Sequence, residues 1–334
     1  MRRLAYACII AVLSCGPLHA QNANLGTAGA LFLKIPVGAR PTAMGGAFTS
    51  CGNDAEALFW NPAGVMGVKG SALGASHEEW WAGSRLNHAA FVQSFGEAGS
   101  FGLSFTSMSM DKIAVTTEDD PEGTSGQSFD AQDIMLGLTY ARDLTEDFSV
   151  GITAKYEHQR IWNENAAGVA VDVGTLYHIG FRDLKLGMSV TNFGGDMTFE
   201  GRDLLVDYDV NSSIATERLL PAQIQAEGYP LPLHFQVGLS MSPYISDDLS
   251  VLVAADVVHP NDNDEIVCAG LEATVLQILS LRGGYRFGDD TARWSAGVGA
   301  SVPAGGNTRI GFDYAYVAYD LLPAIHRFGI AVAF

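Results

Sequence analysis

The chain has 334 residues, of which 48% are hydrophobic and 17% are charged, and it contains 38 glycines. The formal net charge of −18 argues against nucleic acid as a partner, because phosphate binding needs a basic surface. Beyond the first twenty residues, no apolar run approaches the roughly 18 residues of a transmembrane helix, so this rather apolar chain would meet lipid by another route.

Residues 1–20 have the features of a secretory signal peptide. An arginine pair precedes the apolar stretch from Leu4 to Leu13, and Ala20 offers a small residue at the expected cleavage point. The alternative is lipoprotein processing at Cys15, although Leu13 fits that pattern poorly. We therefore expect this leader to be removed during export from the cytoplasm.

Residues 21–70 form the next unit and do not alternate between apolar and polar side chains. Asn53 or Asp54 is a suitable helix N-cap, residues 55–60 fit one or two helical turns, and Pro62 would end them. We therefore predict one short helix, flanked by glycines, ahead of the first strand.

From Ser71 onward, apolar residues alternate with small or polar ones, as in Leu233–Met241. Successive side chains of a strand point to opposite faces, so each such segment has one apolar face. Fourteen segments show this pattern. They begin near Ser71, Leu86, Gly99, Asp133, Phe148, Val169, Lys185, Leu233, Leu249, Ile266, Leu279, Ala292, Thr308 and His326.

The lengths of these segments and of their connections favour a membrane barrel. Each segment has about ten residues, as in a tilted transmembrane strand, whereas the average strand has about five or six. Connections after even-numbered segments are short, and the two longest, 109–132 and 194–232, follow odd-numbered ones. We predict an all-β fold, in which residues 71–334 form an antiparallel β-barrel of about 14 strands in the bacterial outer membrane. An even strand number would leave both termini in the periplasm.

The last segment runs to the end of the chain, with apolar residues at alternate positions. A terminal aromatic residue in such a strand is typical of the signal that barrel-assembly machinery reads. We therefore interpret Phe328, Ile330, Val332 and Phe334 as a barrel-assembly signal.

A barrel of this size has a lumen that wall side chains alone cannot fill. We expect residues 39–64 to fold back into the lumen as a plug, with Gly45 and Gly46 letting the backbone pass close to the wall. The predicted plug motif comprises Gly45, Gly46, Phe48, Asn53, Asp54, Trp60, Asn61, Pro62, Ala63 and Gly64.

Charged residues occur on the polar faces of the segments. Each would be costly in hydrocarbon, so we expect them to face the lumen. Both signs occur, which favours networks that brace the wall or hold the plug over a selectivity ring of one sign. The set comprises Lys155, Glu157, Asp172, Asp256, Glu272, Arg282, Arg286, Arg293, Arg309 and Asp313.

No catalytic motif is present: the chain has no P-loop, no GxSxG and no HExxH. His77-Glu78-Glu79, at the end of the first segment, is more typical of a solvated strand end than of an active site. The acidic stretches 118–120 and 261–265 lack the glycine and the distal glutamate of a dedicated calcium loop. We therefore expect a protein without catalytic residues, metal or cofactor.

Two cysteines, Cys51 and Cys268, lie beyond the leader. They either form one disulfide in an oxidising compartment or pack separately as small apolar side chains. They are far apart and form no CxxC pattern, so they do not suggest a metal site.

The stretch GARPTAMGGAFTSCGNDAEALFWNPAG, residues 38–64, resembles the N-terminal signature of the PorV/PorQ family of outer-membrane proteins. LSLRGGYRF and FDYAYVAYDLLPAIHRFGIAVAF are similar to that family's last strands. The element from Asn61 to Gly64 is also similar to that of FadL-type hydrocarbon and fatty-acid transporters. Both resemblances imply a fourteen-stranded barrel with an N-terminal plug. They cover about residues 38–334, most weakly over 194–232.

These resemblances imply two functions. A PorV-like protein would be a component of type IX secretion that binds secreted cargo proteins and escorts them to surface-processing machinery. A FadL-like protein would pass small hydrophobic molecules, with the plug moving aside or the wall opening sideways. A transporter would need a continuous apolar pocket between the wall and Phe48, Leu58, Phe59 and Trp60, whereas an escort would need only a stable plug. A structural barrel without a passenger is the third possibility.

Overall fold

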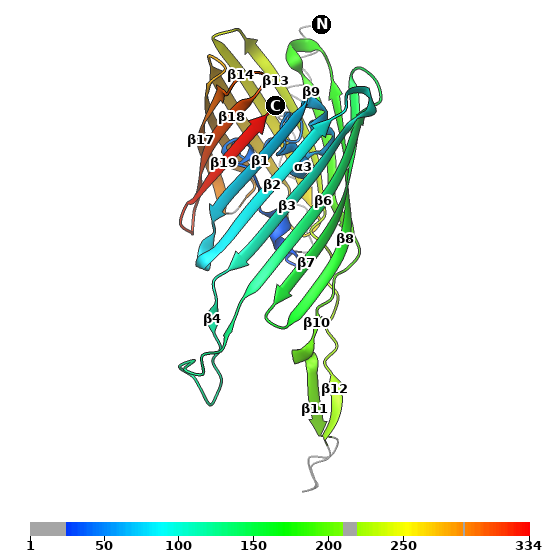
Figure 1. The fold of residues 1–334 in the computed structure, drawn as a ribbon, viewed down its shortest axis with the longest axis vertical. Coiled ribbons are helices and arrows are strands. Elements are labelled where there is room, and N and C mark those ends of the chain that lie inside the picture. Colours follow the sequence, from blue (N-terminus) through cyan, green and yellow to red (C-terminus); the bar gives the residue numbers. More distant parts are fainter. Residues whose placement is uncertain (1–24, 210–218, 290) are drawn as a thin grey trace.

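Fourteen antiparallel strands close into a barrel in the computed structural model, which describes residues 25–209, 219–289 and 291–334 (Figure 1). Strands that follow one another along the wall pair with one another, and β1 pairs with β19 to close the ring. The barrel strands are β1 (Ser71–Glu79), β2 (Ser84–Ser94), β3 (Ser100–Met110), β6 (Ala131–Asp143), β7 (Phe148–Ile161), β8 (Glu164–His178), β9 (Lys185–Gly194), β13 (His234–Ile245), β14 (Leu249–Pro260), β15 (Ile266–Val275), β16 (Leu279–Phe287), β17 (Ala292–Pro303), β18 (Arg309–Tyr319) and β19 (Ile325–Ala333).

The predicted fold is confirmed, and the predicted strand starts lie within two residues of the observed ones except at β8. That strand begins at Glu164 instead of Val169, because its ladder with β7 continues to the pair Ile161 and Glu164. The added residues, Asn-Ala-Ala-Gly after Glu164, do not alternate between apolar and polar side chains. Backbone pairing therefore extended a strand that the side-chain pattern did not reveal.

The outer face of the wall is apolar across the whole barrel. On β3, for example, Leu103 is 57% exposed and Phe105 is 38% exposed, whereas Ser104 and Thr106 point inward and are buried. Such a continuous apolar surface matches hydrocarbon and not water. No helix among the described residues is long and apolar enough to cross a membrane.

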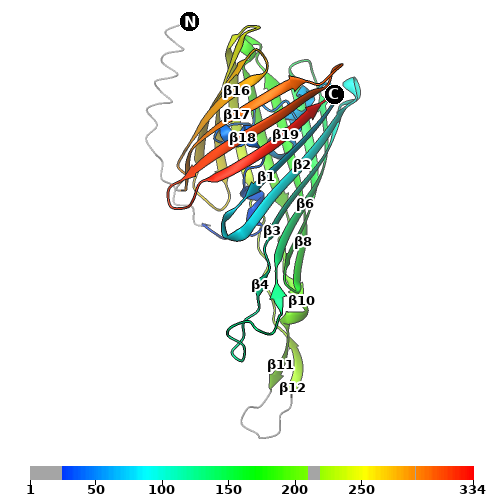
Figure 2. The ribbon, with the colours of Figure 1, turned by 60° about the vertical axis from the view of Figure 1, so that its left-hand side comes forward.

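The two ends of the barrel differ in their connections. At one end, here called the short-turn end, the turns are brief and Phe334 exchanges two backbone hydrogen bonds with Ser71. The opposite end, the long-loop end, carries the connections 111–130 and 195–233. These contain the paired strands β4 (Ile113–Ala114) and β5 (Ser128–Phe129), and β11 (Leu205–Asp209) and β12 (Leu219–Gln223), which project beyond the wall (Figures 1 and 2). The short β10 (Glu200–Gly201) extends the edge of β8.

Residues 25–70, here called the N-terminal segment, pass through the lumen from the long-loop end to the short-turn end. Gly26 donates its amide hydrogen to the carbonyl of Asp262, in the β14–β15 connection at the long-loop end. Gly70, at the other end, accepts from the amide of Ser94. The segment contains η1 (Leu31–Lys34), α2 (Ala39–Ala43), α3 (Ala57–Trp60) and η2 (Pro62–Gly67).

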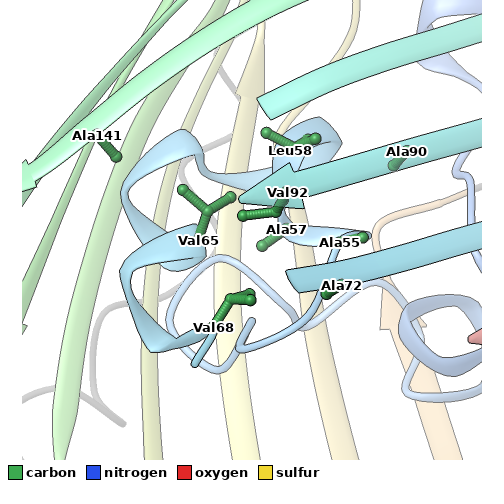
Figure 3. Close-up of a cluster of buried hydrophobic side chains, with 9 residues drawn as sticks. All are labelled: Ala55, Ala57, Leu58, Val65, Val68, Ala72, Ala90, Val92 and Ala141. Carbon is green, nitrogen blue, oxygen red and sulfur yellow. The ribbon is translucent and has the colours of Figure 1, made fainter. Parts of the chain in front are cut away.

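Near the short-turn end, the N-terminal segment packs against the wall through small and branched apolar side chains (Figure 3). Leu58 and Val65 of the segment lie in one buried cluster with Val92 of β2 and Ala141 of β6. The predicted leader, residues 1–20, lies outside the described residues.

Candidate functional site

The contact between the N-terminal segment and the wall is the candidate site, and glycines of the wall make room for it. A Cβ at Gly284 would overlap the backbone nitrogen of Gly45, and a Cβ at Gly187 would overlap the carbonyl oxygen of Thr49. Gly45 itself has φ +69° and no space for a side chain, since a Cβ there would lie 2.8 Å from the nitrogen of Tyr285. Only glycines allow the two backbones to approach this closely.

The predicted motif residues 61–64 tie three parts of the molecule together. Asn61 is buried, and its Nδ2 donates to the carbonyl oxygens of Thr49 (2.7 Å) and Thr175 (3.0 Å). Its Oδ1 accepts from the amide of Ala63 at 3.1 Å, which caps η2, and Pro62 occupies the first turn of that helix. One side chain thus joins the N-terminal segment to itself and to β8.

The helix before this motif is shorter than predicted. It begins at Ala57, and Glu56 is the N-cap residue, without a side-chain capping bond. Asp54 accepts instead from the amide of Glu56 at 3.1 Å, within a turn that precedes the helix. Asn53 makes no cap, because its Oδ1 accepts from Arg40 at 2.8 Å.

The middle of the N-terminal segment forms a second apolar cluster around Phe48 and Trp60, whose ring centroids are 6.2 Å apart. Trp60 Nε1 donates to the carbonyl oxygen of Val37 at 3.2 Å, which fixes the edge of the indole. Cys51 and Cys268 are buried free thiols in this same cluster. Burial raises the pKa of the Cys51 thiol, which keeps it in the neutral form.

Asp256 of β14 holds the start of this cluster to the wall. Its Oδ2 accepts from the backbone amides of Phe48 (2.9 Å) and Thr49 (2.8 Å), and Asp256 is 1% exposed. Thr49 Oγ1 also donates to Oε1 of Gln236, on β13, at 3.0 Å. A buried carboxylate is thus used to satisfy two backbone donors of a non-helical loop.

A chain of ion pairs anchors α2 near the short-turn end. Arg40 contacts Glu272 (2.9 Å) and Asp54 (2.7 Å), and Arg282 contacts Glu272 (2.6 Å) and Asp313 (2.5 Å). Alternating signs connect the N-terminal segment to β15, β16 and β18. This arrangement is a brace and not a ring of one sign.

The other predicted lumen charges divide into buried and exposed residues. Lys155 is buried and pairs with Asp172 at 2.8 Å, whereas Glu157 is buried with neither carboxylate oxygen hydrogen-bonded. Arg286 pairs with Asp289 at 3.2 Å. Arg293 and Arg309 are exposed instead, Arg293 beside Asp320 at the long-loop end and Arg309 beside Ser301 at the short-turn end.

Sequence reasoning missed one buried ion pair. Glu78, predicted to belong to a solvated strand end, is 1% exposed and contacts Arg327 of β19, which also contacts Thr42. Its neighbours His77 and Glu79 are exposed, as alternation requires. The same alternation could have identified Glu78, because only every second residue of β1 faces outward.

A third apolar cluster, here called the mouth cluster, lies at the long-loop end. Phe32 and Leu33 of η1 pack there beneath Met197 and Leu231 of the second long loop. The wall contributes small and flexible side chains. The buried members are Ala30, Phe32, Leu33, Met135, Ala166, Ala170, Met197 and Leu231, with Met108, Phe199 and Tyr229 against them. No sequence pattern marked it, because its parts come from a non-alternating segment, a long loop and three strands.

Cavities inside the described lumen are small or polar. One of about 50 Å³ lies beside Phe59 and Trp60, but Lys155, Asn192 and His234 also line it. Another, of about 470 Å³, opens at the short-turn end among the charges of the Arg40 brace. Neither of these two cavities is a continuous apolar pocket, so a passenger could pass only if the space between Trp60 and the wall were opened. The N-terminal segment occupies that space.

Glu56 lines the larger of these cavities. Its Oε2 has no hydrogen-bond partner, and burial, together with the charge of Asp54, raises the pKa of Glu56 well above its ordinary value. Within the described residues, no group of three or more histidines, cysteines and acids could hold a metal ion.

Comparisons with known proteins identify the architecture. A family model described as an uncharacterised protein family, UPF0164, matches residues 10–129, which is less than half of the chain. No curated protein matches the sequence.

Three solved structures of the same fold are a toluene transporter of Ralstonia pickettii, TbuX, a toluene transporter of Pseudomonas putida, TodX, and a FadL homologue of Pseudomonas aeruginosa. Their TM-scores are 0.53, 0.56 and 0.56 at identities of 14%, 13% and 10%. Each comparison covers 89% of this chain and 97%, 96% and 98% of the other chain, respectively. The chain thus has the fold of FadL-like outer-membrane barrels.

Proposed function

We propose that the protein spans the bacterial outer membrane, with its long-loop end toward the exterior and its short-turn end toward the periplasm. The apolar outer wall supports this placement, and long outer loops with short periplasmic turns are typical of outer-membrane barrels. Phe334 then lies in the periplasm, and the alternating residues that end at Phe334 serve as the barrel-assembly signal.

The sequence predicts a periplasmic N-terminus. Gly26 is hydrogen-bonded to Asp262 at the long-loop end, so we propose instead that the chain enters the lumen from the exterior.

The function that the geometry supports best is the passage of small hydrophobic molecules. The observation that carries it is the mouth cluster, where Phe32 and Leu33 fill an apolar receptacle beneath the outer loops. The wall and loop supply three methionines to it, and methionine adapts to differently shaped apolar guests. A small apolar molecule would replace Phe32 and Leu33, and the N-terminal segment would then withdraw from the lumen.

The local structure of η1 supports its release. It is one short 3-10 turn, preceded by Ala30 with φ 48°, a left-handed conformation that costs a non-glycine residue about 1 kcal/mol or more. The part-buried ion pair of Lys34 and Asp262, at 2.8 Å, holds its end and opposes this release. The fold it shares with toluene transporters is a second support, although fold alone does not carry a substrate.

The test is uptake of radiolabelled toluene by a host strain without its own hydrocarbon channel. We expect the protein to raise uptake above the empty-vector rate. Phe32→Ala/Leu33→Ala should raise it further at low toluene, up to about tenfold, because the protein's own side chains no longer compete for the receptacle. Leu31→Ala is the matched control, since Leu31 lies on the same turn and is exposed. Uptake equal to the vector rate for the wild type and both variants would exclude this function.

The second candidate is a PorV/PorQ-type component of type IX secretion, which binds secreted proteins and escorts them to surface-processing machinery. The resemblance of residues 38–64 favours it, and so does the filled lumen, since an escort needs a closed barrel and an outer surface. Its test is a deletion strain. Cargo with C-terminal signals should then fail to reach the surface, and normal delivery would contradict the idea.

A further inference from the structure

Among the described residues, the ribbon formed by β11 and β12 lies farthest from the wall (Figures 1 and 2). Its two strands pair only with each other within the described residues, so both of its outer edges carry unpaired backbone groups. A two-stranded ribbon alone in water is marginally stable and usually packs against something else.

One face of the ribbon is apolar. The register pairs Val206 with Ala222 and Tyr208 with Leu220, and Ile224 continues the same face. These side chains are not covered: Tyr208 is 61%, Leu220 45% and Ile224 51% exposed. In a barrel that projects the ribbon outside the membrane, this face points into water, where an unpartnered apolar surface marks an interaction site.

The surroundings of this face are acidic. The opposite face carries Asp207 and Gln223 beside Leu205 and Pro221. In the sequence, the connection 195–233 also contains Asp196, Glu200, Asp203 and Glu227, and its bases are Arg202 and Arg218, so acids outnumber bases. The other long loop adds Glu118, Asp119, Asp120 and Glu122 at the same end of the barrel. Hydrogen bonds from Thr124 and Ser125 hold the pKa of Asp120 at about 2, so this carboxylate stays charged.

We infer that the apolar face of the β11–β12 ribbon binds an extended, basic segment of another polypeptide. Alternate apolar side chains of that segment would cover Val206, Tyr208 and Leu220, and its backbone could pair with a free edge of the ribbon. Its lysines or arginines would meet the surrounding carboxylates. This surface is separate from the lumen and does not depend on uptake, and it would serve the escort candidate.

The acidic residues near the ribbon favour a basic polypeptide over a second copy of the chain or anionic lipid. A second copy of the chain, with its formal charge of −18, would bring acidic loops against acidic loops. Anionic lipid headgroups would be repelled in the same way. A basic polypeptide is the occupant that satisfies both the apolar face and the acidic border.

The experiment uses the full-length protein in neutral detergent micelles. The probe is a fluorescent ten-residue peptide in which lysine alternates with valine, and its counterpart carries glutamate in place of lysine. We expect saturable binding of the lysine peptide, weakened by salt. Binding should fall at least tenfold in Val206→Ser/Tyr208→Ser/Leu220→Ser, which leaves every charge in place.

Leu205→Ser/Gln223→Ser is the matched control, because both residues are exposed on the opposite face of the same ribbon. It should bind within about twofold of the wild type, and hydrogen exchange of β11 and β12 should slow only when the lysine peptide is present. Equal loss in both variants, or equal binding of the glutamate peptide, would overturn the inference. Slow hydrogen exchange of the ribbon without peptide would also overturn it, because detergent would then cover the ribbon. A dimer of the protein that dissociates only when the apolar face is substituted would overturn it too.

Discussion

A single wall carboxylate, Asp256, determines how firmly the middle of the N-terminal segment is held. Its Oδ2 accepts two backbone hydrogen bonds from residues that have no helix or strand to satisfy them. Removing it would leave both donors buried and unpaired, at a cost of about 1–3 kcal/mol each. The adjacent Cys51, a buried free thiol, provides a direct reporter of loosening.

We predict that Asp256→Ala, in a Cys268→Ser background, increases the rate at which a maleimide labels Cys51 by roughly ten- to a hundredfold. Glu157→Gln is the control, because Glu157 is an equally buried wall carboxylate that accepts no hydrogen bond. The labelling rate of Cys51 in the control should match that of the parent. If Asp256→Ala also leaves the rate unchanged, Asp256 does not hold the segment.

At the scale of an element, β16 shows how a strand is adapted on one face only. Gly284 faces the lumen, where the backbone of Gly45 occupies the space of a side chain, whereas a Cβ at Gly283 would meet no atom within 4 Å. Gly284→Ala should lower the stability of the folded barrel by about 1–3 kcal/mol, through overpacking, and Gly283→Ala should leave it nearly unchanged. Heat-modifiability on gels measures both. Equal transition temperatures for the two variants would contradict the close approach.

The strands were predictable because one physical rule, alternation of side chains across a sheet, repeats along the chain. Leu103 and Ser104 show it plainly, and it located the strands and their connections. The rule predicts nothing about contacts between distant segments of the chain whose side chains do not alternate. The burial of Phe32, which needs a loop residue such as Met197, and the apolar face of β11 and β12 therefore emerged only from the three-dimensional structure.

The sequence predicted which residues of the candidate site face the lumen, but not which residues they contact. The glycines, Asn61 and the wall charges could be assigned to the lumen from their positions, but the partner of each could not. Pairings such as that of Arg40 with Glu272 depend on the path of a segment that has no regular pattern. Arg293 and Arg309 show the limit of the argument, since the polar face of a strand becomes a solvent-exposed rim at its ends.

The whole molecule is a wide barrel that is closed by its own N-terminal segment. Three apolar clusters, the hydrogen bonds to Asp256 and the ion pairs of Arg40 hold that segment from one end of the lumen to the other. Fourteen strands enclose a lumen that would conduct ions if it were empty. A lumen closed by the N-terminal segment should therefore carry no ion current.

The most direct measurement is the ion conductance of the purified protein in a planar lipid bilayer, beside a variant that lacks residues 25–64. We predict that the intact protein inserts without sustained current steps, whereas the variant gives open steps at least tenfold larger than any residual current of the intact protein. Sustained open-pore steps from the intact protein, equal to those of the variant, would contradict the account.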